Sequence, residues 1–402
     1  MSTHLSQPPI LARFLCRHFS KDVRGRSITS TPSFFAVARD LSHSCSLLPL
    51  NPQRTRTMST AATFSNFPTE HERFLFDLNG YLVLRNVFTE AEIAGMNAEV
   101  DGWKKENKVV YRENMKLKNA PTTTSTETQK NGDQTVPSPM SGLTTSAEHS
   151  RGDLGGILSA KAFRNVLTHP KLVPYFTALL GRGYRMDHQP FVILQNKDSE
   201  GFSLHGGPVG GKDHRPIPEL QYHCQNGWIT QSLLACSVAL HDAPAGAGGY
   251  VVVPGSHKLN FSMPHGFDDA TTLPGKAFFE EHVQQPVLKK GDVVLFSEAT
   301  IHGAVTWKAD FERRVALYRF APANVAYGRM YLGEETKGPF GLDLKELTEE
   351  EKAVLLPPYA VRTERMCVEV DKEEGGRVKV GFDKRTAEKK EHDFKVFGTK
   401  WF

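Results

Sequence analysis

Long apolar runs are missing from this sequence. Candidates such as Val251–Pro254 and Val293–Phe296 are short and are bounded by glycine or charged residues. A helix that crosses a bilayer needs about 20 consecutive apolar residues. We therefore expect these runs to be buried strands, and we expect no stable membrane insertion.

Cysteines are few, odd in number and scattered. The five are Cys16, Cys45, Cys224, Cys236 and Cys367, and no Cys-x-x-Cys pair is present. A small disulfide framework and a thiolate zinc site both need cysteines at closer, paired spacings. The pattern excludes these two classes and favours buried or free thiols in a reducing compartment.

A strong excess of one charge is also absent. The net charge is only +4 and the basic residues form no dense stripe, so nucleic acid is not an expected partner. Hydrophobic residues make up 39% of 402 positions, which is enough for a substantial core. Charged residues make up 23%, which is an ordinary value for a soluble protein.

Acidic residues are scarce in the first sixty positions. Eight arginines and lysines stand there against Asp22 and Asp40, and serine and threonine are frequent. This bias is typical of a mitochondrial or plastid transit peptide. Two alternatives remain open for residues 1–60: a disordered leader, or a stretch ahead of a start at Met58, which would leave the protein cytoplasmic.

The rest of the chain changes from helical to strand-like patterns. Helices are predicted over 91–105 and 160–180, and residues 117–150, rich in Thr, Ser, Pro and Gly, are predicted to be a mobile insertion. Short β-type runs punctuated by Gly and Pro fill 184–320. We therefore expect a mainly β fold of the jelly-roll type with a helical buttress, over 67–360, and a charged C-terminal extension over 361–402.

Two histidines and an arginine form the chemical candidate. His205 precedes a glycine-rich stretch, His302 ends a hydrophobic run, and Arg313 follows His302 by eleven positions. Non-haem iron oxygenases hold Fe(II) with a facial set of protein ligands that leaves positions open for other molecules. A planar guanidinium can bind a carboxylate of a cosubstrate through two hydrogen bonds. Alone, these three residues are a weak signal.

The surrounding motifs strengthen it. The segments 246–258 (GAGGYVVVPGSHK) and 290–296 (KGDVVLF), followed by His302-Gly303, resemble signatures of the phytanoyl-CoA dioxygenase family. The resemblance covers roughly residues 67–360. It implies a double-stranded β-helix (cupin-like) fold, Fe(II) and 2-oxoglutarate as cofactors, His205 and His302 as metal ligands, and Arg313 as the residue that binds 2-oxoglutarate. It also implies hydroxylation of a small-molecule or lipid-like substrate.

One position departs from the family pattern. The family's proximal motif is His-x-Asp, whose aspartate binds the metal, but Gly207 stands at the aspartate position here. His223 is a competing proximal position that also lacks the carboxylate. Three interpretations are open. Glu298, Asp213 or Glu219 supplies another carboxylate, with Glu298 the nearest candidate. Alternatively, a halide occupies the gap, as in related iron halogenases, or the protein is a non-catalytic scaffold.

Glu298 poses a geometric question. It precedes His302 by four positions, and in a regular strand this spacing keeps both side chains on one face. Four strand residues nevertheless span about 13 Å, so Glu298 reaches a shared metal only if a bulge near Ala299-Thr300 shortens the distance. A hydroxylase with an unusual third ligand is the preferred interpretation, and the reach of Glu298 decides whether that ligand exists.

Overall fold

The structure is a computed structural model that describes residues 68–111, 151–199, 201–270, 272–328, 331, 342–361, 365–371, 376–382 and 387–398. The predicted leader over 1–60 and the predicted insertion over 117–150 lie outside these ranges. Within them, no helix is both long and apolar enough to cross a membrane.

The helices and strands are as follows. The α-helices are α1 (Glu70–Asn79), α2 (Glu90–Lys105), α3 (Lys161–Arg164), α4 (Val173–Leu180), α5 (Leu273–His282), α6 (Glu349–Val354) and α7 (Ala387–Phe397). The 3₁₀ helices are η2 (Ile157–Ser159), η3 (Asn165–Thr168), η4 (Pro218–Leu220), η5 (Ser256–Lys258) and η7 (Leu344–Glu346). The strands are β1 (Tyr81–Leu84), β2 (Val110–Tyr111), β3 (Gly152–Leu154), β4 (Arg185–Gln195), β5 (Phe202–His205), β6 (Val209–Gly210), β7 (Arg215–Pro216), β8 (Tyr222–Gln225), β9 (Trp228–Gln231), β10 (Leu234–Ala239), β11 (Gly249–Val252), β12 (Val293–Ser297), β13 (His302–Val305), β14 (Arg313–Ala321), β15 (Cys367–Asp371) and β16 (Arg377–Gly381).

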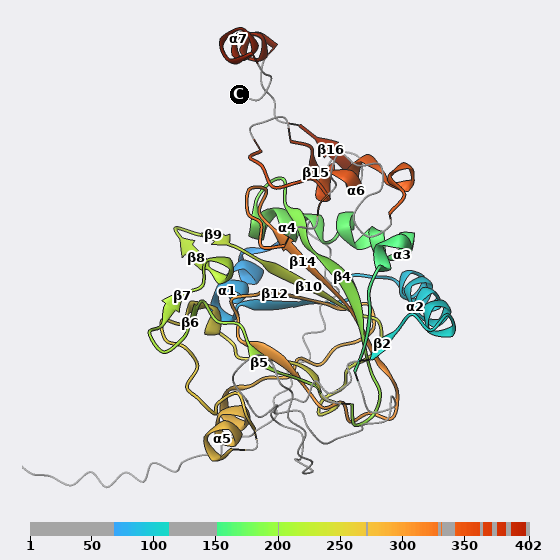
Figure 1. The fold of residues 1–402 in the computed structure, drawn as a ribbon, viewed down its shortest axis with the longest axis vertical. Coiled ribbons are helices and arrows are strands. Elements are labelled where there is room, and N and C mark those ends of the chain that lie inside the picture. Colours follow the sequence, from blue (N-terminus) through green and yellow to red (C-terminus); the bar gives the residue numbers. More distant parts are fainter. Residues whose placement is uncertain are drawn as a thin grey trace, which may run out of the picture. The chain divides into compact units, whose positions relative to one another are not determined.

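Two antiparallel sheets form the body of the fold (Figure 1). The large sheet has the order β1-β12-β10-β14-β4-β3-β2, and the small sheet has the order β11-β13-β5. Strands that are distant in sequence are neighbours in the sheet; for example, β10 pairs with both β12 and β14. This arrangement confirms the expected mainly β, jelly-roll fold with a helical buttress.

The large sheet is covered on both faces. Every residue of β10 is buried, so the strand shows no alternation of apolar and polar positions. Cys236 and Val238 pack with residues of α1, α2 and α4 in the main core, whereas Ala235 and Ala239 pack with Tyr250 of the small sheet. One face of the large sheet therefore carries the helices, and the other faces the small sheet.

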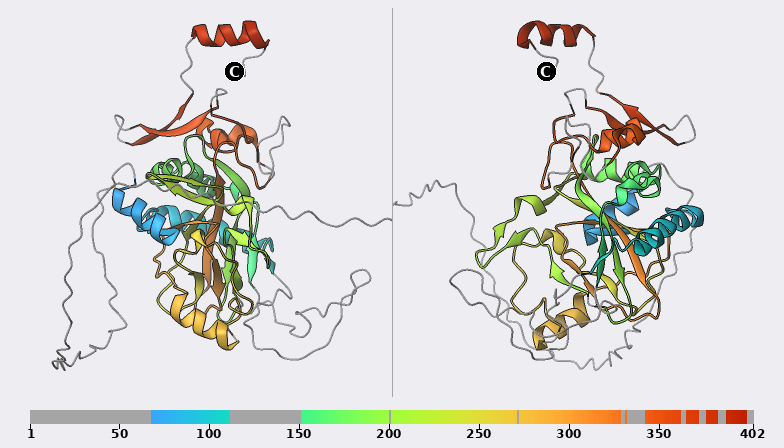
Figure 2. Two further views of the ribbon diagram at one scale, coloured as in Figure 1. Left: turned by 90° about the vertical axis from the view of Figure 1, so that its left-hand side faces the viewer. Right: turned by 45° about the vertical axis from the view of Figure 1, so that its right-hand side comes forward.

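The outer face of the small sheet has its own cover. Leu204 of β5 and Val251 of β11 cluster with Ile301 and with Phe278 and Phe279 of α5. Figure 2 shows α5, in gold, well separated from α3 and α4, in green. The space between the two sheets is thus enclosed, and side chains that point inward from either sheet are removed from bulk water.

Of the two helices predicted over 91–105 and 160–180, the first is confirmed and the second is not. Thr89 and Glu92 form a capping box at the start of α2, where the predicted helix 91–105 lies. The single helix predicted over 160–180 is wrong, because α3, η3 and α4 are separate pieces. Pro170 lies in the break, and a proline disfavours helical backbone at the residue before it.

Candidate metal site

His205 and His302 lie side by side on the small sheet. They are direct partners across the β5–β13 pairing, so their side chains share one face. The centroids of the two imidazole rings are 4.2 Å apart. His302 also lies 4.6 Å from the ring of Phe296, an inward-facing residue of β12, by the same measure. Both rings therefore face the enclosed space between the sheets.

Each imidazole is oriented by a backbone carbonyl. Nδ1 of His205 lies 2.9 Å from the carbonyl oxygen of Ser203, and Nδ1 of His302 lies 2.7 Å from that of Thr300. A carbonyl can only accept, so Nδ1 carries the hydrogen in both rings and Nε2 keeps its lone pair. Metal-binding histidines are held in this way by a partner on the other ring nitrogen.

Burial keeps both rings neutral. It lowers the pKa of His302 to about 4, with a further contribution from neighbouring His205. Burial also lowers the pKa of His205 from its ordinary value. At neutral pH the two Nε2 atoms are therefore free to bind a metal ion without first losing a proton.

Gly207 does not face this site. Its φ is +93°, and a Cβ built there would lie 3.6 Å from Cγ1 of Ile301, which belongs to the cluster under α5. A side chain at position 207 would point towards that outer cluster. With this backbone conformation, an aspartate at position 207 would point away from the two histidines.

Glu298 comes much closer than an extended strand would allow. β12 ends at Ser297 and β13 begins at His302, so Glu298 and His302 flank a turn and are not part of one strand. Oε2 of Glu298 lies 3.9 Å from Nε2 of His302. The distance of about 13 Å for a regular strand does not apply, because the chain between the two residues is a turn and not the bulged strand that we considered.

The turn that carries Glu298 is anchored on several sides. The amide of Thr300 donates to the carbonyl of Ser297 at 2.8 Å, and the Thr300 hydroxyl donates to the carbonyl of Gly80 at 3.1 Å. The hydroxyl of Ser256 accepts from the amide of Ile301 at 2.7 Å. The Pro-Gly-Ser-His segment thus has a structural task, which is to hold the loop between the two candidate ligands.

The other acidic candidates lie elsewhere. Asp213 forms an ion pair with Arg215, Glu219 belongs to η4, and His223 lies on the β8–β9 hairpin. Among the described residues, no group of three or more His, Cys, Asp or Glu side chains is already set to hold a metal. Glu298 is the acidic candidate that lies close to a candidate histidine ligand, and a shared metal would require its Oε2 to come closer to Nε2 of His302 than 3.9 Å, since donor atoms around one metal lie about 3 Å apart.

Arg313 and Arg314 point to opposite faces of β14. Arg313 is buried, and its Nη1 donates to Oε1 of Gln195 at 2.6 Å. A Cβ on Gly249 of β11 would lie 2.5 Å from Nε of Arg313, so the guanidinium reaches across to the small sheet. Arg314 instead pairs with Asp101 of α2 at 2.7 Å.

The environment of Arg313 is unusual for an arginine. Burial, together with the nearby charge of Arg151, lowers its pKa to about 9. A dicarboxylate bound beside it would supply the missing negative charge in a low-dielectric setting. The side chain is thus suited to binding an anion inside the fold.

Arg319 was missed in the sequence. It lies on β14, six positions after Arg313, and its Nε donates to Oε1 of Glu298 at 2.6 Å. Even spacing along a strand returns to the same face, and this was the available signal. The β4–β14 pairing is irregular around Leu317 and Arg319, so spacing alone could not place the side chain.

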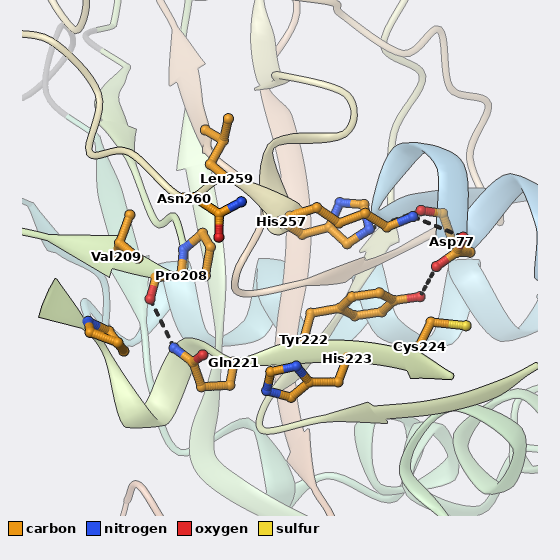
Figure 3. Close-up of a pocket in the computed structure, with 12 residues that line it drawn as sticks. Asp77, Pro208, Val209, Gln221, Tyr222, His223, Cys224, His257, Leu259 and Asn260 are labelled. Carbon is orange, nitrogen blue, oxygen red and sulfur yellow. Dashed lines mark hydrogen bonds and ion pairs between the residues drawn. The ribbon is translucent and has the colours of Figure 1, made fainter. Parts of the chain in front are cut away.

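A separate pocket is lined in part by residues that follow the candidate proximal histidine closely in the sequence. It has a volume of about 410 Å³ and is lined from α1, β8 and η5 and by the segment that follows Gly207. The hydroxyl of Tyr222 donates to Asp77 at 2.9 Å (Figure 3). Nζ of Lys258 pairs with the same carboxylate at 2.8 Å. Neither His205 nor His302 lines this pocket. A molecule bound in it would therefore lie outside the candidate metal site.

The family model described as "Phytanoyl-CoA dioxygenase (PhyH)" matches residues 76–315. The chain therefore belongs to the phytanoyl-CoA dioxygenase family. That range contains His205, Glu298, His302 and Arg313. Family membership supports a dioxygenase-type function. The comparison with curated proteins gave no match.

Solved structures give weaker likenesses. HygX from Streptomyces hygroscopicus, with nickel, 2-oxoglutarate and hygromycin B bound, is 18% identical, with a TM-score of 0.49 over 66% of this chain and 92% of that one. The non-heme alpha ketoglutarate dependent epimerase SnoN from nogalamycin biosynthesis is 20% identical, with a TM-score of 0.41 over 68% and 86%. Both scores are below 0.5, so the fold assignment rests on the strand topology and the family match.

Proposed function

We propose that this protein is an Fe(II)- and 2-oxoglutarate-dependent dioxygenase that hydroxylates a small-molecule or lipid-like substrate. His205, His302 and Glu298 would hold the metal, and Arg313 would bind the distal carboxylate of 2-oxoglutarate. The observation that carries the proposal is the pair of neutral imidazoles, each with Nδ1 held by a carbonyl and Nε2 facing the enclosed space. HygX, described with iron bound and with nickel and 2-oxoglutarate bound, is consistent with these cofactors.

The chain's own residues perform three tasks in this scheme. The two histidines and Glu298 would hold the metal, as three protein ligands do in non-haem iron oxygenases, which keep other positions for the cosubstrate and oxygen. Arg313 orients the cosubstrate from deeper between the sheets, and Gln195 fixes its guanidinium. The inward-facing apolar residues of the two sheets, such as Phe296 and Leu317, exclude water. When bound, iron with 2-oxoglutarate and oxygen supplies the oxidising chemistry.

Gly207 keeps two alternatives in consideration, an iron halogenase and a scaffold without activity. Two features of the structure favour the hydroxylase. Oε2 of Glu298 lies 3.9 Å from Nε2 of His302, so a carboxylate is already close to one of the two candidate histidine ligands. Glu298 is also negatively charged, because burial raises its pKa but the ion pair with Arg319 outweighs that effect and holds the pKa below its ordinary value.

The test is an anaerobic titration of the metal-free protein with Fe(II) and 2-oxoglutarate. We expect a weak visible charge-transfer band, and succinate formation once oxygen is admitted. The band should be absent in His302→Ala. Turnover that requires chloride and gives a halogenated product would favour the halogenase, and a protein that never takes up Fe(II) would favour the scaffold.

A further inference from the structure

At the candidate metal site, the buried carboxylate of Glu298 forms an ion pair with Arg319, whose side chain is partly exposed. Only 7% of the surface of Glu298 is exposed. Nε of Arg319 lies 2.6 Å from Oε1 of this carboxylate. A carboxylate buried to this degree is costly unless it is paired, so Arg319 supplies much of the stabilisation that lets Glu298 stay ionised here.

The ion pair also orients the carboxylate. Arg319 occupies Oε1, whereas Oε2 is directed towards His302, 3.9 Å from its Nε2. One oxygen is therefore held by the protein and the other lies near Nε2 of His302. Partners of this kind, which bind the far atom of a metal ligand, fix the orientation of that ligand and tune its affinity.

The pair comes from two sheet elements that meet only in the folded state. Glu298 belongs to the anchored turn between β12 and β13, and Arg319 belongs to β14, two strands away across β10. Because the turn is tied to Gly80 and Ser256, the backbone of Glu298 has little freedom. Rotation of its side chain is then the remaining freedom, and the bond to Arg319 removes it.

We propose that Arg319 is a positioning residue that presents Glu298 to the metal as a one-oxygen ligand, in place of the carboxylate that Gly207 lacks. This inference rests on the proposed function, since it requires a metal at His205 and His302. It goes beyond the proposed function because it assigns a role to a residue outside the metal's own ligands. It also predicts that the effects of Arg319 and Glu298 on metal binding are coupled.

The experiment measures the affinity of the full-length, metal-free protein for Mn(II) by calorimetry, without 2-oxoglutarate. Arg319→Met is expected to weaken Mn(II) binding by about 10- to 100-fold, the effect typical of losing such a partner. Arg319→Lys keeps the positive charge and should recover part of that loss. Circular dichroism and thermal melting of each variant establish that it is folded.

Arg314→Met is the matched control. Arg314 is the arginine on the opposite face of the same strand, where it pairs with Glu312 and Asp101. Its replacement removes a comparable ion pair without touching Glu298, and Mn(II) affinity should remain that of the wild type. The double variant Arg319→Met/Glu298→Gln should bind no more weakly than Glu298→Gln alone, because both changes remove one interaction.

The outcomes separate the two proposals. If the wild type binds no Mn(II), the proposed function fails and this inference fails with it. If the wild type binds Mn(II) and His302→Ala does not, the metal site stands. In that case, equal affinities for Arg319→Met and Arg314→Met, or additive losses in the double variant, overturn the role of Arg319 alone.

Discussion

Replacing Gly207 with aspartate restores the family's His-x-Asp motif on paper, and the structure predicts that it does not restore a ligand. The φ of +93° is unfavourable for any residue with a Cβ. The added side chain would lie against Ile301, in the cluster under α5, and not between His205 and His302. The variant should therefore lose stability without gaining metal affinity.

The magnitude follows from two effects. A sparsely populated backbone conformation costs about 1–3 kcal/mol, and Gly207→Ala isolates this cost because its Cβ meets no close contact. That loss corresponds to a decrease in Tm of about 2–12 °C for a domain of 150–250 residues. Gly207→Asp should be less stable than Gly207→Ala, because it also buries a carboxylate beside an apolar side chain.

Thermal melts of the two variants, followed by Mn(II) titration, test this reasoning. Gly206→Ala gives a useful comparison, because its φ is +97° and its Cβ would lie only 2.6 Å from the carbonyl oxygen of Thr300. We expect stability to decrease in the order wild type, Gly207→Ala, Gly206→Ala. Tighter Mn(II) binding by Gly207→Asp than by Gly207→Ala would refute the argument, since it would show that position 207 can reach the metal.

Three further predictions concern other parts of the chain. Arg313→Ala should weaken 2-oxoglutarate binding by about 10- to 100-fold, because hydrogen bonds to charged groups contribute about 1.5–3 kcal/mol. Arg314→Ala should leave this affinity unchanged. The reverse pattern in calorimetry would contradict the assignment of Arg313. Burial and Lys258 lower the pKa of His257 from 6.5 to about 4. The unfolded chain then binds the proton more readily than the folded one, so this contribution to stability should be complete above pH 6.5 and decrease towards pH 4, by on the order of 2 kcal/mol. In urea melts, His257→Gln should lose less stability than the wild type between neutral pH and pH 4.5. An equal loss in both proteins would argue against His257 as the source of the pH dependence. A fluorescent protein fused to residues 1–57 should enter mitochondria or plastids, and a diffuse cytosolic signal would count against a transit peptide.

The sequence by itself determined the parts that depend on local pattern. Short apolar runs such as 293–297 predicted strands, because their length and their β-branched and aromatic residues are local features. The motifs around His205 and His302 identified both histidines, and the eleven-residue spacing to Arg313 selected it over Arg314. The structure places their side chains on the faces that these patterns imply.

Only the tertiary structure decided how the third metal ligand could be supplied. The reach of Glu298 depends on a turn held by Gly80 and Ser256, which are distant in sequence and whose hydrogen bonds no local pattern reveals. The pairing of Arg319 with Glu298 depends on the order of β12, β10 and β14 in one sheet. The direction that a side chain at position 207 would take depends on the positive φ of Gly207, which a glycine permits but does not require. These are contacts between distant segments, and they exist only once the two sheets have closed on each other.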